Sequence, residues 1–525
     1  MKRVSVLGLI VGASLFGAAC GGGNTPPNTP GSGAGAPHAT GVGGNPVADA
    51  AAASFKTALD SFLAHDKAND WNEGNCASVA KDFEASVDQQ ASKKFPEAHY
   101  NAALAFQRCD KDSEAKALFG KALSEDPKFH HAKAAMTLYQ LKADNNVDAA
   151  ILALEDIVKE AAFQNVPALV NLAMLQMDRD TDHIGETCKT FKDGKPIELR
   201  DFECAKLNLQ RALAIDDSYM PAFNQLALYY FKGAKKRGAA SDAKAAATAP
   251  KVAPARGKRD VGRTGKRKFV DVQALELAAL VCSQAIRKGP TYAPIYNTAG
   301  LIQSELGQIN GAVGSFQKAA ALDQRFFEAQ MNLAAVNLGY RGFDRAQEAY
   351  GKAIAVKPND YEAHLGLALA LRGQITDVNF DKQVPAVQSE LDQCKKLDAN
   401  RPDALFNEGI LTQEYKANSG GSKDAQVAQL EAALAIFTTF VTKAADKPAY
   451  AEGVKKANDR IEDIKATIAF LKEAPASAAP PPPVAPGAAT PTPATDPTGG
   501  ATAPAAPKDA PPSPAPGQPL VPKPH

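Results

Sequence analysis

Apolar and small residues recur at a fixed interval through the middle of the chain. The stretches 293–323 and 327–357 superimpose at a shift of 34 residues. Spacings of four and then three residues are shared by Ala312, Phe316 and Ala319 and by Ala346, Tyr350 and Ala353. These spacings place side chains on one face of a helix. A fixed period of this size is typical of stacked helix pairs.

Each repeated unit is expected to hold two amphipathic helices joined by a tight turn. Small residues such as Gly300, Ala334 and Gly409 let the first helix approach its neighbours closely. One large apolar side chain of the second helix then fills the space that remains. The same offsets recur with varying fidelity from about residue 97 to residue 440, which predicts eight units.

We expect further helices at both ends of the repeats. An opening pair is predicted within 48–90, where Phe55 and Leu59 share one face, and a last helix is predicted over 450–473. A polar outer face on the last helix would keep the stack soluble. The predicted all-α domain is therefore 48–473.

These features resemble the tetratricopeptide repeat (TPR) family, whose unit is a helix–turn–helix of about 34 residues. One departure is the Trp expected in each first helix, which is replaced here by His99, Phe223, Tyr296 or Gln330. The resemblance implies an all-α TPR solenoid of stacked antiparallel helix pairs. It also implies a surface that holds other molecules rather than a catalytic pocket.

The beginning of the chain is expected to be an export signal. Lys2 and Arg3 precede an apolar run over 4–16, and small residues lead up to Cys20. This pattern resembles the bacterial lipoprotein cleavage site, where the Cys becomes the first residue and carries fatty acid such as palmitate. We expect a lipoprotein signal peptide at 1–19 and lipidation of Cys20. A plain secretory signal is the alternative.

Two segments of low complexity flank the predicted domain. Residues 20–47 are rich in Gly and Pro and should form a flexible tether. The residue after the Cys is Gly21, not the Asp that retains lipoproteins at the inner membrane of enteric-like bacteria. We therefore expect the outer membrane, with the domain facing the periplasm. Residues 474–525 are mostly Pro, Ala, Thr and Ser, which predicts a disordered tail. It is either a spacer, a ligand for a partner or a segment that reaches through the cell wall.

Six cysteines follow Cys20, and the periplasm is oxidising. Cys188 and Cys204 bracket the end of an insertion and are candidates for one disulfide, and Cys76 and Cys109 are candidates for another. Free thiols remain the alternative at these four positions, because sequence cannot fix connectivity. The other two, Cys282 and Cys394, fall at packing positions and are expected to be buried free thiols.

Two insertions interrupt the units. Residues 232–268 hold 13 Lys or Arg and two Asp, a local charge of 13 − 2 = +11 in a chain of net charge +1. This basic insert is either a solvated disordered loop or an arm that binds an anionic partner, with nucleic acid excluded by export. Residues 178–200 are expected to be an exposed loop. We predict no metal site and no cofactor.

A partner groove is predicted on the concave side, which first helices line in TPR solenoids. A row of Asn side chains there can hydrogen-bond an extended peptide, or alternatively hold adjacent units together. The groove residues are Tyr100, Asn101, Leu104, Asn171, Asn224, Asn297, Leu301, Asn332, Ala335 and Asn407. The Lys and Arg that clamp a terminal carboxylate in some TPR proteins are missing, so a free C-terminus is not the expected ligand.

The predicted function is that of a non-catalytic scaffold that docks other envelope proteins into a multiprotein complex. The layout resembles TPR lipoproteins of myxobacterial gliding machinery and, less closely, those that assist pilus secretins. The alternative is a regulator or binder of cell-wall (peptidoglycan) synthesis. An enzyme is not expected, because no zinc-protease motif, nucleophile elbow or Gly-rich phosphate loop is present in a suitable context.

Overall fold

The computed structural model describes most of the predicted domain of the 525-residue chain: residues 41, 46–68, 70–248, 271–419 and 421–473. The predicted signal peptide, Cys20 and the tail 474–525 lie outside these described residues, as do most of the predicted tether and residues 249–270 of the basic insert.

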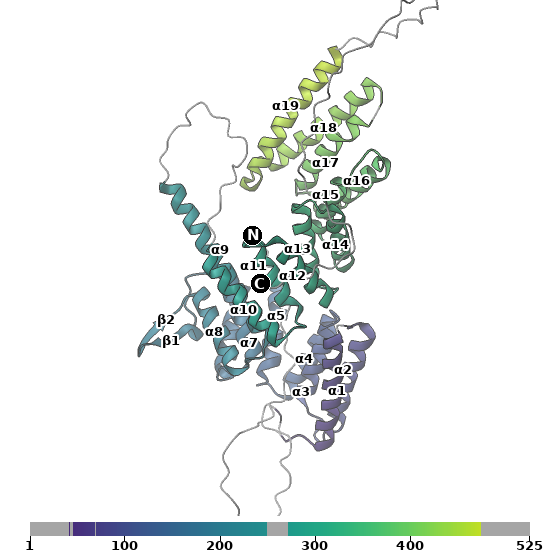
Figure 1. The fold of residues 1–525 in the computed structure, drawn as a ribbon. Helices are drawn as coiled ribbons and strands as arrows, with labels where there is room; N and C mark the ends of the chain where they lie inside the picture. Colours follow the sequence, from purple (N-terminus) through teal and green to yellow (C-terminus); the bar gives the residue numbers. More distant parts are fainter. Residues whose placement is uncertain (1–40, 42–45, 69, 249–270, 420, 474–525) are drawn as a thin grey trace, which may run out of the picture. The chain divides into compact units, whose positions relative to one another are not determined.

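The expected all-α stack of helix pairs is confirmed. Within the described ranges the chain forms nineteen α-helices, and consecutive helices pack against each other (Figure 1). The opening pair is α1 (Asp49–Ala68) and α2 (Glu73–Asp88), and the last helix is α19 (Ala451–Glu473). The eight units between them are α3 (Pro96–Gln107) with α4 (Asp112–Glu125), α5 (His130–Asp144) with α6 (Val147–Glu160), α7 (Val166–Arg179) with α8 (Asp201–Ile215), α9 (Met220–Thr248) with α10 (Val272–Lys288), α11 (Ala293–Glu305) with α12 (Ile309–Leu322), α13 (Phe327–Gly339) with α14 (Phe343–Val356), α15 (Tyr361–Arg372) with α16 (Phe380–Leu397), and α17 (Asp403–Glu414) with α18 (Lys423–Ala444).

The repeat extends to the backbone of the turn inside a unit. Five residues that follow a first helix have positive φ: Asp110 at 57°, Asn145 at 55°, Asp180 at 45°, Gly307 at 73° and Arg341 at 64°. A left-handed residue ends a helix by redirecting the chain. The same left-handed residue therefore joins the two helices in five units, although only one of these residues is Gly.

Small residues meet aromatic rings where the two helices of a unit cross. A Cβ on Gly300 would lie 2.5 Å from Cε1 of Phe316, and one on Gly409 would lie 2.7 Å from Cε1 of Phe437. Both rings are buried, with 2% and 0% of their surface exposed. The aromatic side chain thus occupies the space that a missing methyl group leaves, as the sequence pattern predicts.

The predicted tether 20–47 is too long at its carboxyl end. Val47 is buried in the first hydrophobic cluster, and Ala48 N donates to Oε1 of Gln90 at 2.8 Å. The Gln90 side chain also donates to the Pro46 carbonyl at 3.4 Å. A single apolar residue next to a Pro gave no periodic signal, so its burial was not foreseen.

The insertion 178–200 is ordered, which corrects the expectation of an exposed loop. It contains a short 3-10 turn (Glu186–Cys188) and a hairpin of β1 (Lys189–Lys192) and β2 (Lys195–Glu198) (Figure 1). Thr187 and Cys188 are fully buried, whereas His183 and Glu186 remain exposed. The two strands are antiparallel, and Phe191 pairs with Pro196.

The basic insert is helical over its first half, since α9 continues to Thr248. Four cations at its start form ion pairs within the domain. Lys235 Nζ lies 2.9 Å from Glu305, Lys236 Nζ lies 2.7 Å from Asp180, Arg237 Nε lies 2.5 Å from Asp271, and Lys232 pairs with Asp178. Part of the predicted charge is therefore neutralised internally.

One described helix, α18, is long and apolar enough to cross a membrane by length and composition. In the structure its buried side chains include Phe437 and Phe440, which contact Phe406 of α17. Ile464 of α19 belongs to the same hydrophobic cluster. The buried apolar residues of α18 are thus part of the hydrophobic core of the last unit.

Candidate binding surfaces

The first unit of the predicted groove is closed by its own core. Tyr100, Asn101 and Leu104 are 2%, 1% and 0% exposed. The ring of Tyr100 lies 5.5 Å from those of Phe119 and Phe129, centroid to centroid. These side chains of α3 are therefore core residues and offer no accessible floor. The helical pattern predicted these residues on the concave face and gave no sign of what covers them.

Most of the predicted Asn row links neighbouring units. Asn224 of α9 accepts a 2.7 Å hydrogen bond from Thr298 Oγ1 of α11, and Asn332 of α13 donates to Asn297 of α11 at 2.9 Å. Between α15 and α17, Arg372 Nη1 donates to Asn407 Oδ1 at 2.9 Å. The structure therefore favours the alternative in which these amides hold adjacent units together.

The remaining groove residues lie in different surroundings. Asn171 is 3% exposed, and its Oδ1 has no hydrogen-bond partner among the described residues. Leu301, Asn332 and Asn407 are half-buried, and Ala335 is exposed. Only these four predicted residues, all from α11, α13 and α17, are left accessible to a partner.

All four candidate cysteines are paired in the structure. One disulfide joins Cys76 to Cys109, with Cα atoms 6.4 Å apart, and the other joins Cys188 to Cys204, at 5.1 Å. Cys282 and Cys394 are free and buried, and burial raises the pKa of each thiol to about 12. At neutral pH these two thiols are protonated and poorly reactive.

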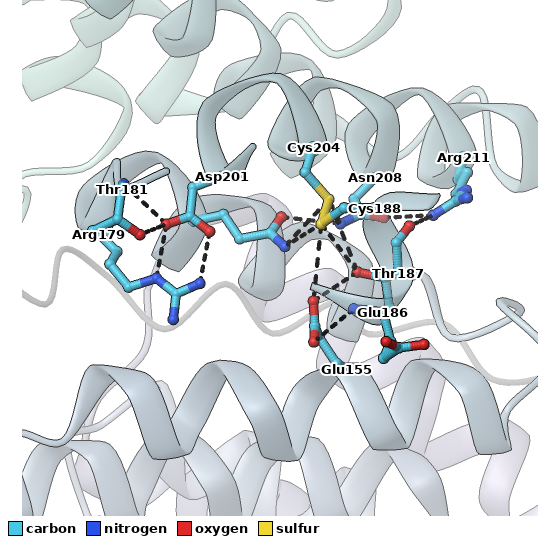
Figure 2. The surroundings of a disulfide bond; sticks show 11 residues. Glu155, Arg179, Thr181, Glu186, Thr187, Cys188, Asp201, Cys204, Asn208 and Arg211 are labelled. Carbon is cyan, nitrogen blue, oxygen red and sulfur yellow. Dashed lines mark hydrogen bonds and ion pairs between the residues drawn. A yellow bond between two sulfur atoms is a disulfide. The ribbon is translucent and has the colours of Figure 1, made fainter. Parts of the chain in front are cut away.

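The Cys188–Cys204 disulfide ties the insertion to α8 and lies in a buried polar network (Figure 2). Glu155 of α6, which is 2% exposed, accepts hydrogen bonds from Thr187 Oγ1 at 3.0 Å and from the backbone N of Glu186 at 3.3 Å. On the other side, Arg211 Nη1 donates to the Thr187 carbonyl at 2.7 Å. The 3-10 turn is thus held by α6 and α8 together.

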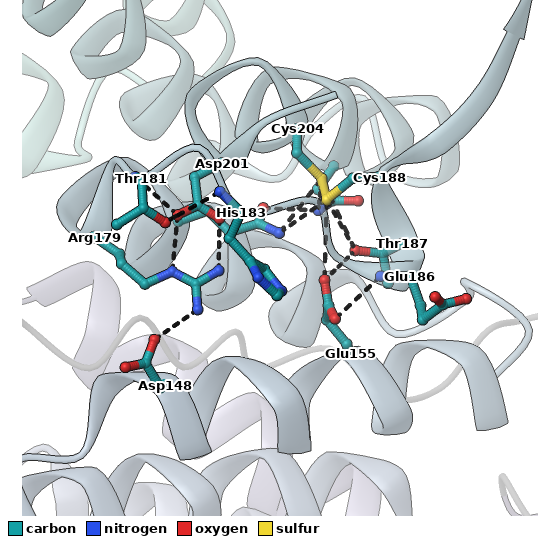
Figure 3. A network of polar contacts seen from close by, with 12 residues as sticks. Asp148, Glu155, Arg179, Thr181, His183, Glu186, Thr187, Cys188, Asp201 and Cys204 are labelled. Atoms are coloured by element: carbon teal, nitrogen blue, oxygen red, sulfur yellow. Dashed lines mark hydrogen bonds and ion pairs between the residues drawn. A yellow bond between two sulfur atoms is a disulfide. The ribbon is translucent and has the colours of Figure 1, made fainter. Parts of the chain in front are cut away.

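A second set of contacts fixes the start of the insertion. Figure 3 shows the guanidinium of Arg179 between Asp201 and Asp148. Its Nε and Nη2 lie 2.8 and 2.6 Å from the carboxylate of Asp201, which is fully buried, and Thr181 donates to the same carboxylate through N and Oγ1. Burial raises the pKa of Asp201, but the hydrogen bonds from Arg179 and Thr181 outweigh it, so the net pKa is lowered.

These supports place a hairpin with an exposed aromatic ring on a fixed base. Phe191 is 75% exposed, which is a larger exposed fraction than that of any other described Phe, Tyr or Trp. Asp193 and Gly194, both at positive φ, form the turn between the strands. The exposed Phe on this anchored element leaves apolar area in contact with solvent. Sequence reasoning missed this hairpin, although its Asp-Gly pair was a usable signal.

The described residues contain no group of three or more His, Cys, Asp or Glu side chains that could hold a metal ion. The geometry presents side chains on the faces of consecutive helix pairs and on the hairpin. The class of protein that the fold defines is a helical repeat protein built from TPR-type units.

Comparison with known proteins finds solved structures of similar fold. No protein-family description and no curated protein matches the chain. Solved structures that resemble it include a thermophilic TPR protein from Thermus thermophilus at 23% identity and TM-score 0.33, covering 46% of this chain and 99% of that one. A tetratricopeptide repeat protein from Parabacteroides merdae has 12% identity and TM-score 0.33, covering 63% and 98%. PilF of Pseudomonas aeruginosa has 14% identity and TM-score 0.35, covering 57% and 97%. The fold assignment rests on the helix pairs themselves.

Proposed function

We propose that the chain is a non-catalytic scaffold that binds other proteins of the cell envelope. The observation that carries this proposal is the hairpin that presents Phe191. Its base is held by a disulfide and by the buried carboxylates of Glu155 and Asp201. A segment held this firmly loses little conformational entropy on binding. Its exposed ring supplies apolar area that a partner can bury.

The two disulfides support an exported protein. Such bonds persist in oxidising compartments and are rare where thiols are kept reduced. Together with the predicted signal peptide and Cys20, they favour a lipid-anchored protein on the periplasmic side of the outer membrane. In this proposal the partners are components of a multiprotein machine of the gliding-motility or pilus and secretion type.

The docking part of the proposal is tested by crosslinking in living cells of the source organism. A photoreactive phenylalanine analogue would replace Phe191 in one variant and Leu152 in a matched control, since Leu152 of α6 is also apolar and 55% exposed. We expect adducts with one envelope protein from position 191, lost in Cys188→Ser. Equal adduct patterns from both positions would contradict docking at the hairpin.

The anchoring part needs a separate experiment. Cys20→Ala is expected to move the protein from the membrane pellet to the soluble periplasmic fraction, with metabolic labelling by a palmitate analogue lost at the same time. A wild-type chain that takes up no label would exclude lipidation at Cys20 without affecting the docking proposal.

A further inference from the structure

A groove runs between the second helices of two successive units, α12 and α14, with α13 beneath it. It consists of two adjoining hollows of about 860 and 560 Å³. Gln317 of α12, Asn337 of α13 and Arg345 of α14 line both hollows. We call this feature the α12–α14 groove.

The floor of the groove combines small apolar residues with amides. Ala320 of α12 and Ala349 of α14 line it together with Leu333 of α13, which leaves room for a peptide backbone. Gln330 also lines it with 4% of its surface exposed, and its carboxamide makes no hydrogen bond to the described part of the chain. This amide can therefore donate to and accept from a peptide backbone without giving up a bond within the chain.

The rim carries one cation without a counter-ion. Among the charged residues of the larger hollow, Lys352 pairs with Glu348 at 2.6 Å and Arg325 pairs with Asp110 at 2.7 Å. Arg345 has no ion pair among the described residues, and it stands where the two hollows meet. A free guanidinium at this position can bind a carboxylate through two parallel hydrogen bonds.

We propose that the α12–α14 groove binds an extended peptide segment that carries Asp or Glu side chains. Arg345 would hold a carboxylate of the peptide, and Gln330 and Gln317 would hydrogen-bond its backbone. Nucleic acid is a poorer fit, because binding a polyanion depends on many cations and the groove offers one that is unpaired. This inference rests on the proposed protein-binding role, but it uses a surface separate from the Phe191 hairpin.

The test uses the full chain in detergent and a short fluorescein-labelled peptide of alternating alanine and glutamate. Fluorescence polarisation should show saturable binding that weakens as salt is raised. Arg345→Ala should weaken it by about tenfold, corresponding to about 1.4 kcal/mol. The matched control is Arg287→Ala, because Arg287 of α10 is also exposed and has no ion pair among the described residues. The same peptide with glutamine in place of glutamate should bind the wild type no better than it binds Arg345→Ala.

Two results would overturn the inference: no binding of the glutamate peptide, or equal binding by the wild type and Arg345→Ala. Arg345→Glu provides a second variant, since it should reject the glutamate peptide and bind a lysine counterpart. If crosslinking from position 191 persists while the peptide fails to bind, only the groove is refuted. Loss of both would refute the scaffold role itself.

Discussion

His99 Nε2 lies 3.0 Å from Oε1 of Glu125, which ties the start of α3 to the end of α4. The other ring nitrogen contacts Glu84 of α2. Burial lowers the pKa of His99, but its hydrogen bonds and charge interactions with the two carboxylates outweigh burial, so the net pKa is raised. The imidazole of His99 thus joins three helices at the position where the TPR family carries Trp.

The His99 contacts predict a pH-dependent stability. Because the folded-state pKa is raised, the contribution is fully present below the unfolded pKa of about 6.5 and is lost as pH rises through the folded value. Urea unfolding between about pH 5.5 and pH 9 should show this slope, and His99→Gln should reduce it. The control is His183→Gln, at an exposed position. Equal slopes in wild type and His99→Gln would show that the ring is not charged in the folded state.

The surroundings of two helical glycines, one at the helix crossing of the fifth unit and one in the sixth unit, predict opposite effects of Gly→Ala substitution. Gly300→Ala places a methyl group 2.5 Å from the ring of Phe316 and should destabilise the fold by about 1–3 kcal/mol. Gly351→Ala, in the interior of α14 with no atom within 4 Å of the added group, should stabilise it by up to about 1 kcal/mol. Chemical denaturation measures both. Similar losses for the two variants would refute the close packing at Gly300.

Loss of the Cys188–Cys204 disulfide should loosen the hairpin before it unfolds the helices. The bond closes a loop of sequence separation 16, so Cys204→Ser should cost about 3 kcal/mol. Hydrogen exchange followed by mass spectrometry should show faster exchange over 186–200 than in α11–α14. Unchanged exchange over 186–200 in Cys204→Ser would mean that the Glu155 contacts alone hold the insertion.

The buried ion pair between Arg179 and Asp201 predicts that removal of one carboxylate strongly lowers the free energy of unfolding. Asp201→Ala would leave Arg179 paired only with Asp148, whose side chain is 76% exposed. We expect a loss of about 3–5 kcal/mol in unfolding free energy. Arg200→Ala is a suitable control, because its partner Asp182 is 84% exposed and such pairs contribute about 0–1 kcal/mol. Equal losses in the two variants would contradict the special role of the buried pair.

The helix pairs could be predicted because their spacing is dictated by packing. Gly300 and Phe316 recur as Ala334 and Tyr350, and a helical period of this kind appears in the sequence whatever the rest of the chain does. The hairpin was missed for the opposite reason. Its strands are four residues each and carry Lys, Pro and Glu, so only the Asp193-Gly194 turn marked it.

The predicted binding residues show that a sequence period does not reveal which other side chains surround a residue. The helical period predicts that Tyr100 and Leu104 lie close together on α3, but it does not predict that other helices bury them. The partners of Asn224 and Asn407 lie one unit away, at sequence separations that no local pattern reveals. Likewise, nothing in the sequence distinguishes Arg345 from other surface arginines, because its isolation depends on where every neighbouring carboxylate points.

The placement of the two disulfides has a mechanical consequence. Both lie between Cys76 and Cys204, and each helix packs chiefly against helices one or two places along the chain. A stretching force applied between α1 and α19 in an oxidising medium should therefore detach helices from the carboxyl end first, one pair at a time. The bonds from α2 to the turn after α3 and from the insertion to α8 should remain closed. Force–extension traces with fewer, longer steps after addition of a reductant would reveal this polarity, and traces unchanged by the reductant would exclude it.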